Sequence, residues 1–179
     1  MSNVGDLSVF EGEEFLKVLN PEVVLVGLNI SRGAITRPLA NFHDPRPQAR
    51  DFKIRYALTG TPLWGGYMTD IIKDYDEKDS GKVEAELRKN RDLEESSVIR
   101  FREEIADLGP RNPTIVAFGR TAYSIIERNL KKDFEVALIS HYAIRDNKEK
   151  YREMVAAQIG TVRFDLLRDT EQKSLSNNL

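Results

Sequence analysis

The sequence predicts an α/β protein, a three-layer α/β/α sandwich in which helices cover both faces of a central four-stranded parallel sheet. Short apolar runs of strand length alternate with segments of helical periodicity, at residues 23–28, 67–72, 114–118 and 136–139. Strands separated by helices pair in parallel, because each helix returns the chain across the sheet. The chain of 179 residues is long enough to bury one substantial core.

The composition is that of one globular domain. Hydrophobic residues make up 40% of the chain and charged residues 31%, which is typical of a folded protein. The formal net charge of −2 argues weakly against a dedicated binder of duplex DNA, although a neutral total is compatible with a local basic face. We expect one domain over residues 9–169, between flexible ends at 1–8 and 170–179.

Several classes of site are excluded by the residues that are missing. The chain has no cysteine, which excludes disulfides, thiolate catalysis and cysteine-ligated zinc or iron–sulfur clusters. No apolar run approaches the roughly 20 residues that span a bilayer. The first residues lack the basic and apolar regions of a signal peptide. The default expectation is therefore a cytoplasmic protein. We also expect a monomer without membrane contact.

The predicted helices and strands end where turn-forming residues occur. Asn20-Pro21 separates the first helix from the first strand, and Gly109-Pro110 separates the long charged helix from the third strand. A loop with three prolines covers residues 31–47. The predicted helices span 9–19, 48–58, 83–108 with a break near Asp92, 120–130, and 147–159 with an extension to 167 left open.

Polar residues follow the strands at their carboxyl ends. Asn29 comes after the first strand, Asp70 lies late in the second, and His141 follows the fourth. In open α/β sheets, ligands bind outside these strand ends. Asn29 is either a turn former, because its side chain bonds local backbone, or a residue that orients a water or a ligand carbonyl. His141 is either a hydrogen-bonded structural residue or a catalytic one.

Two further residues have competing interpretations. Phe42 lies in the polar loop and is either an apolar plug or a stacking platform for a planar ring. Its neighbours His43 and Asp44 fall short of a metal-ligand set. Asp70 stands in an apolar strand and needs partners, which are loop amides, Lys73 or the N–H groups of a ligand. The first strand-end turn lacks the glycine patterns of phosphate-binding loops, and no GxSxG nucleophile motif occurs.

Four segments, taken in order, resemble the uracil-DNA glycosylase superfamily over roughly residues 22–155. They are Gly27-Leu28-Asn29-Ile30, the TDIIK segment at Asp70, the PTIVAFG strand and turn, and the SHYA segment at His141. The first is similar to the motif of the mismatch-specific uracil/thymine branch, usually glycine, apolar, asparagine, proline, glycine. The last is similar to the superfamily's second motif, which usually begins His-Pro-Ser.

The resemblance implies excision of a base that is extruded from DNA by a monofunctional glycosylase, a hydrolase of DNA repair. Asn29 would position the water that attacks C1′, and His141 would donate to the O2 atom of the leaving base. Phe42 would stack on the base, and Ile144 or Arg145 would wedge the duplex. The chemistry that the resemblance implies needs neither metal nor cofactor. The implied substrate-binding residues are Gly27, Leu28, Ile30, Phe42, Asp70, Tyr142, Ile144 and Arg145.

The sequence also departs from the family pattern. Ile30 replaces a proline, Tyr142-Ala143 replace proline and serine, and Asp70 stands where many members have the asparagine that reads uracil. An ionised carboxylate accepts hydrogen bonds but donates none, so it suits N3–H but not O4 of uracil. The recognised base therefore stays open. The alternatives are a non-catalytic member of the fold that binds a nucleobase, nucleotide or nucleic acid, and a hydrolase of free nucleosides.

Overall fold

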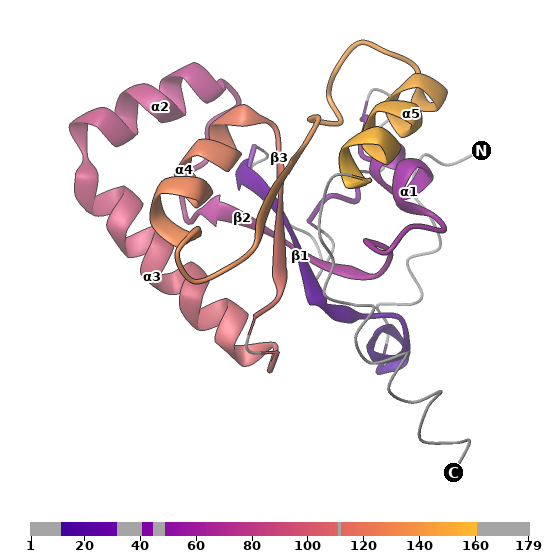
Figure 1. Cartoon of the computed structure of the whole chain (residues 1–179). Coiled ribbons are helices and arrows are strands. Elements are labelled where there is room, and N and C mark those ends of the chain that lie inside the picture. The colour runs from indigo at the N-terminus through magenta and orange to yellow at the C-terminus, as the bar shows by residue number, and fades with distance from the viewer. Residues whose placement is uncertain (1–11, 32–40, 45–48, 111, 161–179) are drawn as a thin grey trace.

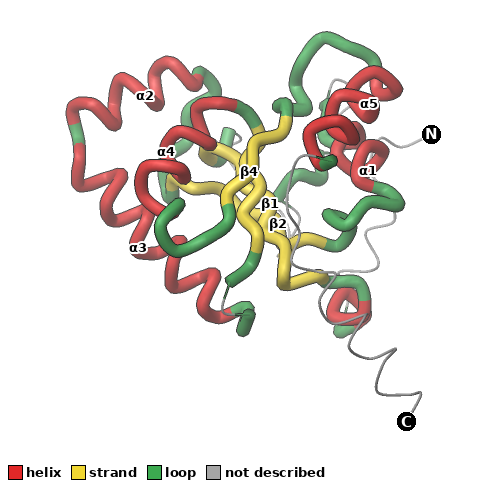
Figure 2. Tube along the Cα trace, in the orientation of Figure 1, coloured by secondary structure: helices red, strands yellow, loops and turns green. Residues whose placement is uncertain are grey.

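The computed structural model describes residues 12–31, 41–44, 49–110 and 112–160. Its strands are β1 (Asn20–Asn29), β2 (Gly66–Ile72), β3 (Thr114–Phe118) and β4 (Val136–Ile139). They form one sheet in the order β2-β1-β3-β4, and every neighbouring pair is parallel. The predicted four-stranded parallel sheet is confirmed, and it lies at the centre of the molecule (Figure 2).

Helices cover both faces of this sheet (Figure 1). One face carries α1 (Phe52–Leu58) and α5 (Lys148–Ile159). The other face carries α2 (Ser80–Lys89), α3 (Arg91–Asp107) and α4 (Arg120–Leu130). The three-layer α/β/α sandwich is therefore confirmed. None of the described helices combines the length and the apolar composition that a membrane crossing requires.

The alternation of side chains along β1 divides the apolar core between the two helical layers. Val24 and Val26 point toward α2, α3 and α4, whereas Val23 and Leu25 point toward α1 and α5. All four are buried, which explains why this segment reads as an unbroken apolar run. By the same alternation Gly27 faces the α1–α5 layer at the carboxyl end of the strand.

The structure corrects several predicted boundaries. Where a helix over 9–19 was expected, the described part contains a short 3₁₀ helix, η2 (Glu14–Lys17), and its Leu16 is exposed. The apolar spacing there does not mark a buried stripe, so the prediction of an amphipathic helix is wrong for these residues. The helix expected over 48–58 begins at Phe52. The extension of α5 beyond residue 160 and the terminal segments lie outside the described residues.

The long charged segment forms two helices, as the expected break near Asp92 indicated. The break falls at Asn90, whose side-chain Oδ1 accepts from the backbone N–H of Leu93 and so caps α3. Asp79 caps α2 in the same way through Gly81 N–H. Both caps place a short polar side chain where the first helical N–H groups need an acceptor.

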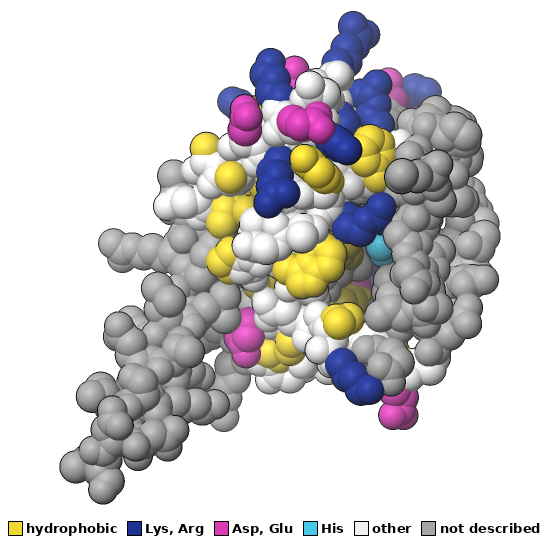
Figure 3. Space-filling model, turned by 90° about the vertical axis from the view of Figure 1, so that its right-hand side faces the viewer, with side chains coloured by type: hydrophobic (Ala, Val, Ile, Leu, Met, Phe, Trp, Pro, Cys, Tyr) yellow, Lys and Arg dark blue, Asp and Glu magenta, His cyan; other side chains and the backbone are white. Residues whose placement is uncertain are grey.

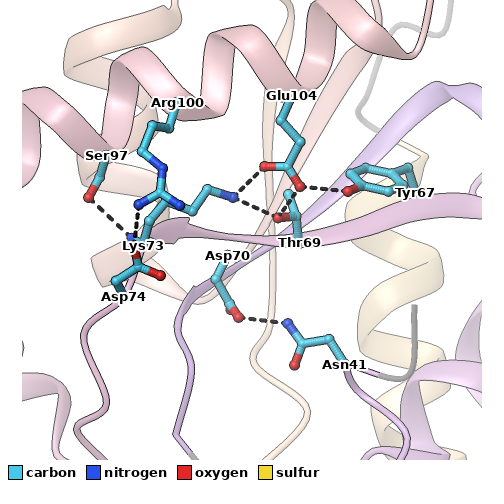
Figure 4. A network of polar contacts seen from close by, with 9 residues as sticks. All are labelled: Asn41, Tyr67, Thr69, Asp70, Lys73, Asp74, Ser97, Arg100 and Glu104. Carbon is cyan, nitrogen blue, oxygen red and sulfur yellow. Dashed lines mark hydrogen bonds and ion pairs between the residues drawn. The ribbon is translucent and has the colours of Figure 1, made fainter. Parts of the chain in front are cut away.

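A partly buried network fastens α3 to β2 (Figure 4). The Glu104 carboxylate accepts from Tyr67 Oη (2.6 Å) and Thr69 Oγ1 (2.8 Å), and it pairs with Lys73. Burial raises the pKa of Glu104, but the hydrogen bonds from Lys73, Tyr67 and Thr69 outweigh it and hold the pKa below its usual range. Burial and the neighbouring carboxylate raise the pKa of Tyr67, which stays a neutral donor.

Candidate functional site

A pocket of about 540 Å³ opens at the carboxyl ends of β1, β2 and β4. It brings together most of the residues that the sequence singled out. The predicted residues that line it are Gly27, Leu28, Asn29, Phe42, Asp70, His141, Tyr142 and Arg145. Residues separated by more than one hundred positions in the chain meet here because parallel strands end at the same edge of the sheet.

The Asn29 side chain holds the loop that connects β2 to α2. Its Nδ2 donates to the carbonyl oxygens of Tyr75 (2.9 Å) and Glu77 (2.8 Å), and to that of Ile30 (3.1 Å). Carbonyl acceptors require the nitrogen at this position, so they fix the orientation of the amide. No described residue donates to Asn29 Oδ1. Asn29 is thus a structural clamp whose oxygen remains available as an acceptor.

His141 lies two residues after the end of β4 and presents a defined tautomer. The backbone N–H of Ala143 donates to His141 Nδ1 at 3.1 Å, so the proton of the neutral ring is on Nε2. Burial lowers the pKa of His141 from its ordinary value of 6.5, although the charge of nearby Asp51 opposes this. At neutral pH the ring is therefore uncharged and has an Nε2–H donor.

Asp70 is buried, and its carboxylate lies over Gly27. The two residues are paired in register across β1 and β2. An ideal Cβ on Gly27 would lie 2.3 Å from Asp70 Oδ1 and 3.0 Å from Phe42 Cζ, so only glycine leaves room for both side chains. Asp70 Oδ2 accepts from Asn41 Nδ2 at 2.7 Å (Figure 4). A loop amide is therefore one partner of this carboxylate, whereas Lys73 turns to Glu104 and Thr69.

Aromatic rings form one wall of the pocket. Phe42 is 6% exposed, and its ring centroid lies 6.0 Å from that of Phe118 and 6.2 Å from that of Tyr142. Phe42 has a left-handed backbone with φ of 53°, a conformation that is rare outside glycine. The Phe42 side chain packs into the apolar core and so anchors its loop, and it also lines the pocket. The two interpretations of Phe42 are compatible.

Two basic residues of the 49–58 region hold the loop that follows His141. Arg50 donates to the carbonyl oxygens of Ala143 (2.7 Å) and Ile144 (2.8 Å). Lys53 is buried, and its Nζ donates to the carbonyl oxygens of Ile144 (2.8 Å) and Asp146 (2.5 Å). Burial and the charge of Arg50 lower the pKa of Lys53. These bonds fix the position of the loop, and the His141 ring stacks on Tyr142 at 4.4 Å between centroids.

Two predicted substrate-binding residues lie elsewhere. Ile30 faces a smaller hollow of about 200 Å³ on the β2 side, together with Lys73 and Glu104. Ile144 packs against the core between the sheet and the α1–α5 layer. Neither lines the pocket at the strand ends. Nor do the described residues include a group of three His, Asp or Glu side chains that would hold a metal.

Several residues that line the pocket were not predicted from the sequence to belong to the site. Asn41, Asp44, Arg50 and Asp51 all reach the pocket, and Asp51 Oδ2 accepts from the Asp44 backbone N–H at 3.0 Å. The sequence signal for Asn41 and Asp44 is their position on either side of Phe42 and His43 in the polar loop. The acidic lining residues are Asp44, Asp51, Asp70 and Glu77, and the basic ones are Arg50, Lys78 and Arg145. The described lining is thus close to neutral, with one acidic group in excess.

Comparison with known proteins adds no family to this picture. No protein-family model matches the chain, and no curated protein sequence matches it significantly.

Proposed function

We propose that this protein hydrolyses the N-glycosidic bond of a nucleobase, with a damaged or mismatched base extruded from DNA as the leading substrate. The supporting observation is that Asn29 and His141 line one pocket with complementary roles. Asn29 offers an acceptor whose amide is fixed, and the uncharged His141 ring offers an Nε2–H donor. The attacking water requires an acceptor, and the departing base requires a donor.

The reaction breaks the bond between C1′ of the sugar and the ring nitrogen of the base. The electron pair leaves with the base, so negative charge develops on the base and positive charge on the sugar. The Nε2–H of His141 would donate to the base oxygen on which negative charge builds. A donor held in place by the Ala143 N–H bond needs no reorganisation during the reaction.

Asn29 would orient the attacking water through Oδ1. An amide does not take up a proton at neutral pH, so the water's proton passes to solvent or to the departing base once the new C–O bond has formed. The three carbonyl groups that hold Asn29 Nδ2 prevent the amide from flipping. Positioning of this kind lowers the entropic part of the barrier.

The test is a substrate panel under single-turnover conditions. Labelled oligonucleotides that contain uracil, hypoxanthine, xanthine or mismatched thymine are incubated with excess protein, and abasic sites are cleaved with alkali. Asn29→Ala protein purified in parallel is the control for contaminating glycosylases. We expect cleavage of at least one oligonucleotide by the wild-type protein alone. Absence of base release from every DNA and nucleoside substrate by a folded sample would refute the proposed activity.

Hydrolysis of free nucleosides is the second candidate, and the charge of the pocket favours it. The described lining has four acidic and three basic side chains, which gives no excess of positive charge to attract a polyanion. On the α1–α5 face, Lys and Arg side chains lie among apolar and acidic ones (Figure 3). Free nucleosides in the same panel, with the released base separated by chromatography, distinguish the two candidates.

Asp70→Asn tests whether residue 70 reads the base edge. Asn41 Nδ2 donates to Asp70 Oδ2, so the new amide would direct its oxygen to Asn41 and its nitrogen toward the pocket. The added donor suits the O4 atom of uracil, and one hydrogen bond contributes about 0.5–1.5 kcal/mol. We expect uracil excision to increase by up to about tenfold relative to hypoxanthine. Adding Asn41→Ala to Asp70→Asn removes the bond that orients the amide and should cancel the gain in uracil excision. An unchanged base preference in Asp70→Asn would exclude a role of residue 70 in reading the base edge.

His141→Asn separates the donor role of the ring from its structural role. The asparagine oxygen takes the place of Nδ1 as acceptor for Ala143 N–H, but the Nε2–H donor is lost. We expect excision to fall by about 10²-fold or more, as for loss of other donors to developing negative charge, with the circular dichroism spectrum unchanged. Full activity in this variant would show that Nε2–H makes no contribution.

The same residue predicts the pH dependence of stability. Folding lowers the pKa of His141 below 6.5, so below that pH the unfolded state binds more protons than the folded state. The free energy of unfolding therefore decreases as the pH falls from about 6.5 through the lowered pKa. Urea unfolding across this range should show the decrease in the wild-type protein and a smaller one in His141→Asn. Equal slopes for both proteins would contradict the assigned shift.

A further inference from the structure

A second pocket, of about 460 Å³, opens in the opposite helical layer, among α2, α3 and α4. Its polar lining is dominated by four arginines, Arg88, Arg91, Arg120 and Arg128, with Glu84 and Glu94 as the acidic members. It shares no lining residue with the pocket at the strand ends. Helix α2 contributes to both pockets: Ser80 lines the pocket at the strand ends, and Glu84 lines the pocket among α2, α3 and α4.

Both carboxylates of this pocket already have partners. Glu94 is buried and accepts from Arg128 Nε (2.7 Å) and from Asn129 Nδ2 (2.9 Å), and it is ion-paired with Arg128. Those bonds hold the pKa of Glu94 below its usual range although burial opposes this, so the group stays ionised. Glu84 Oε1 accepts from Thr121 Oγ1 at 2.8 Å, and Glu84 Oε2 lies 3.9 Å from Arg88 Nη1.

Arg91 and Arg120 are the two cations of the pocket that form no direct bond with these carboxylates, although the charge of Arg91 contributes to the lowered pKa of Glu94. Neither makes a hydrogen bond or an ion pair with a residue of the described chain. Both are exposed and line the pocket from the first residue of α3 and of α4, respectively. Four arginines against two glutamates leave two positive charges in excess in a protein whose formal net charge is −2.

We propose that this arginine pocket binds a phosphate group. Guanidinium groups match the geometry of phosphate oxygens and form paired, charge-assisted hydrogen bonds to them. A phosphate dianion would neutralise the two excess charges, and the volume accommodates the phosphate together with an attached organic group. The phosphate belongs either to a free phosphorylated small molecule or to a nucleic-acid strand, and the same guanidinium chemistry recognises both.

The test measures binding of two probes by calorimetry, inorganic pyrophosphate and a single-stranded oligonucleotide with a 5′-phosphate. The variant Arg91→Gln/Arg120→Gln removes the two excess charges. Lys89→Gln/Lys132→Gln is the matched control, because it removes two exposed charges that lie outside the pocket. We expect saturable binding that weakens about tenfold or more in the arginine variant and stays nearly unchanged in the lysine control.

The two probes identify the source of the phosphate. Saturable binding of pyrophosphate assigns the site to free phosphorylated small molecules, and binding of the oligonucleotide alone assigns it to a nucleic-acid strand. Chemical shifts of the arginine Nε–Hε groups should move for Arg91 and Arg120 on titration with the bound probe. Equal weakening in both double variants, or no saturable binding of either probe, would overturn the proposal. The binding measurement does not depend on base hydrolysis, because Arg91 and Arg120 do not line the pocket at the strand ends.

Discussion

Replacing Asn29 with alanine is expected to reduce base release by about 10²–10⁴-fold, as for loss of a positioned catalytic group. The variant loses the Oδ1 acceptor that would hold the attacking water. It also loses the donor that fixes the carbonyl groups of Tyr75 and Glu77, so the loop from β2 to α2 is less well held. Because a hydrogen bond contributes roughly 0.5–1.5 kcal/mol, we expect the free energy of unfolding to fall by about 1–3 kcal/mol.

The loss of stability must be separated from the loss of activity. Asn90→Ala is the matched control, because it removes another asparagine whose side chain bonds the backbone, at the start of α3 and outside the pocket. Loss of this cap costs about 0.5–2 kcal/mol. Both variants are assayed well below their melting temperatures, with excision normalised to folded protein. If Asn90→Ala loses as much activity as Asn29→Ala, the effect is one of stability and the assignment to the water is wrong.

Replacing Gly27 with alanine is expected to weaken substrate binding and to lower the stability of the protein. The new Cβ would approach Asp70 Oδ1 to 2.3 Å and Phe42 Cζ to 3.0 Å, so the strand, the carboxylate or the ring must move. Overpacking of a well-packed site costs about 1–3 kcal/mol. Because the displaced groups are the proposed base-edge reader and an aromatic wall, we expect weaker substrate binding together with a lower melting temperature.

Gly160→Ala is the control for this substitution. At Gly160 the nearest atoms to an added Cβ lie at 3.6 Å, an ordinary contact, and the backbone has φ of −59°. An alanine there should leave stability unchanged or raise it slightly, by restricting the unfolded chain. Substrate affinity is measured for both variants by fluorescence anisotropy. Wild-type affinity and stability in Gly27→Ala would show that the close packing over Gly27 has no role.

Much of the fold could be predicted from the sequence, because the sheet is buried on both faces. Continuous apolar runs such as Val23–Val26 occur where both helical layers cover a strand, as they do for β1 and β3. The run over β2 is interrupted by the buried polar residues Thr69 and Asp70. The two charged helices were also predicted, because Val98, Phe101 and Ile105 form a helical stripe. The first helix was wrong in its described part, because Leu16, one of the apolar positions on which the prediction rested, is exposed and only Glu14–Lys17 is helical.

The sequence pattern itself pointed to the candidate site mainly where the site rests on strand ends. Asn29 is the last residue of β1 and His141 lies two residues after β4, so the topology brings them to one edge of the sheet. The roles of Arg50 and Lys53 depend on contacts with carbonyl groups about ninety positions away, which no local pattern indicates. The position of Asp70 over Gly27 depends on the register between β1 and β2. Such long-range pairings are set by tertiary packing and leave no signal in the spacing of residues.

The most direct test of the central claim is to follow both products of base release in isotopically labelled water. Wild-type and Asn29→Ala proteins are incubated with the preferred substrate of the panel, and the free base and the sugar product are analysed by mass spectrometry. We expect the wild-type protein to release free base and to incorporate the label at C1′, and Asn29→Ala to do so at least about 10²-fold more slowly. Release of unlabelled sugar product, or equal rates for the two proteins, would contradict this claim.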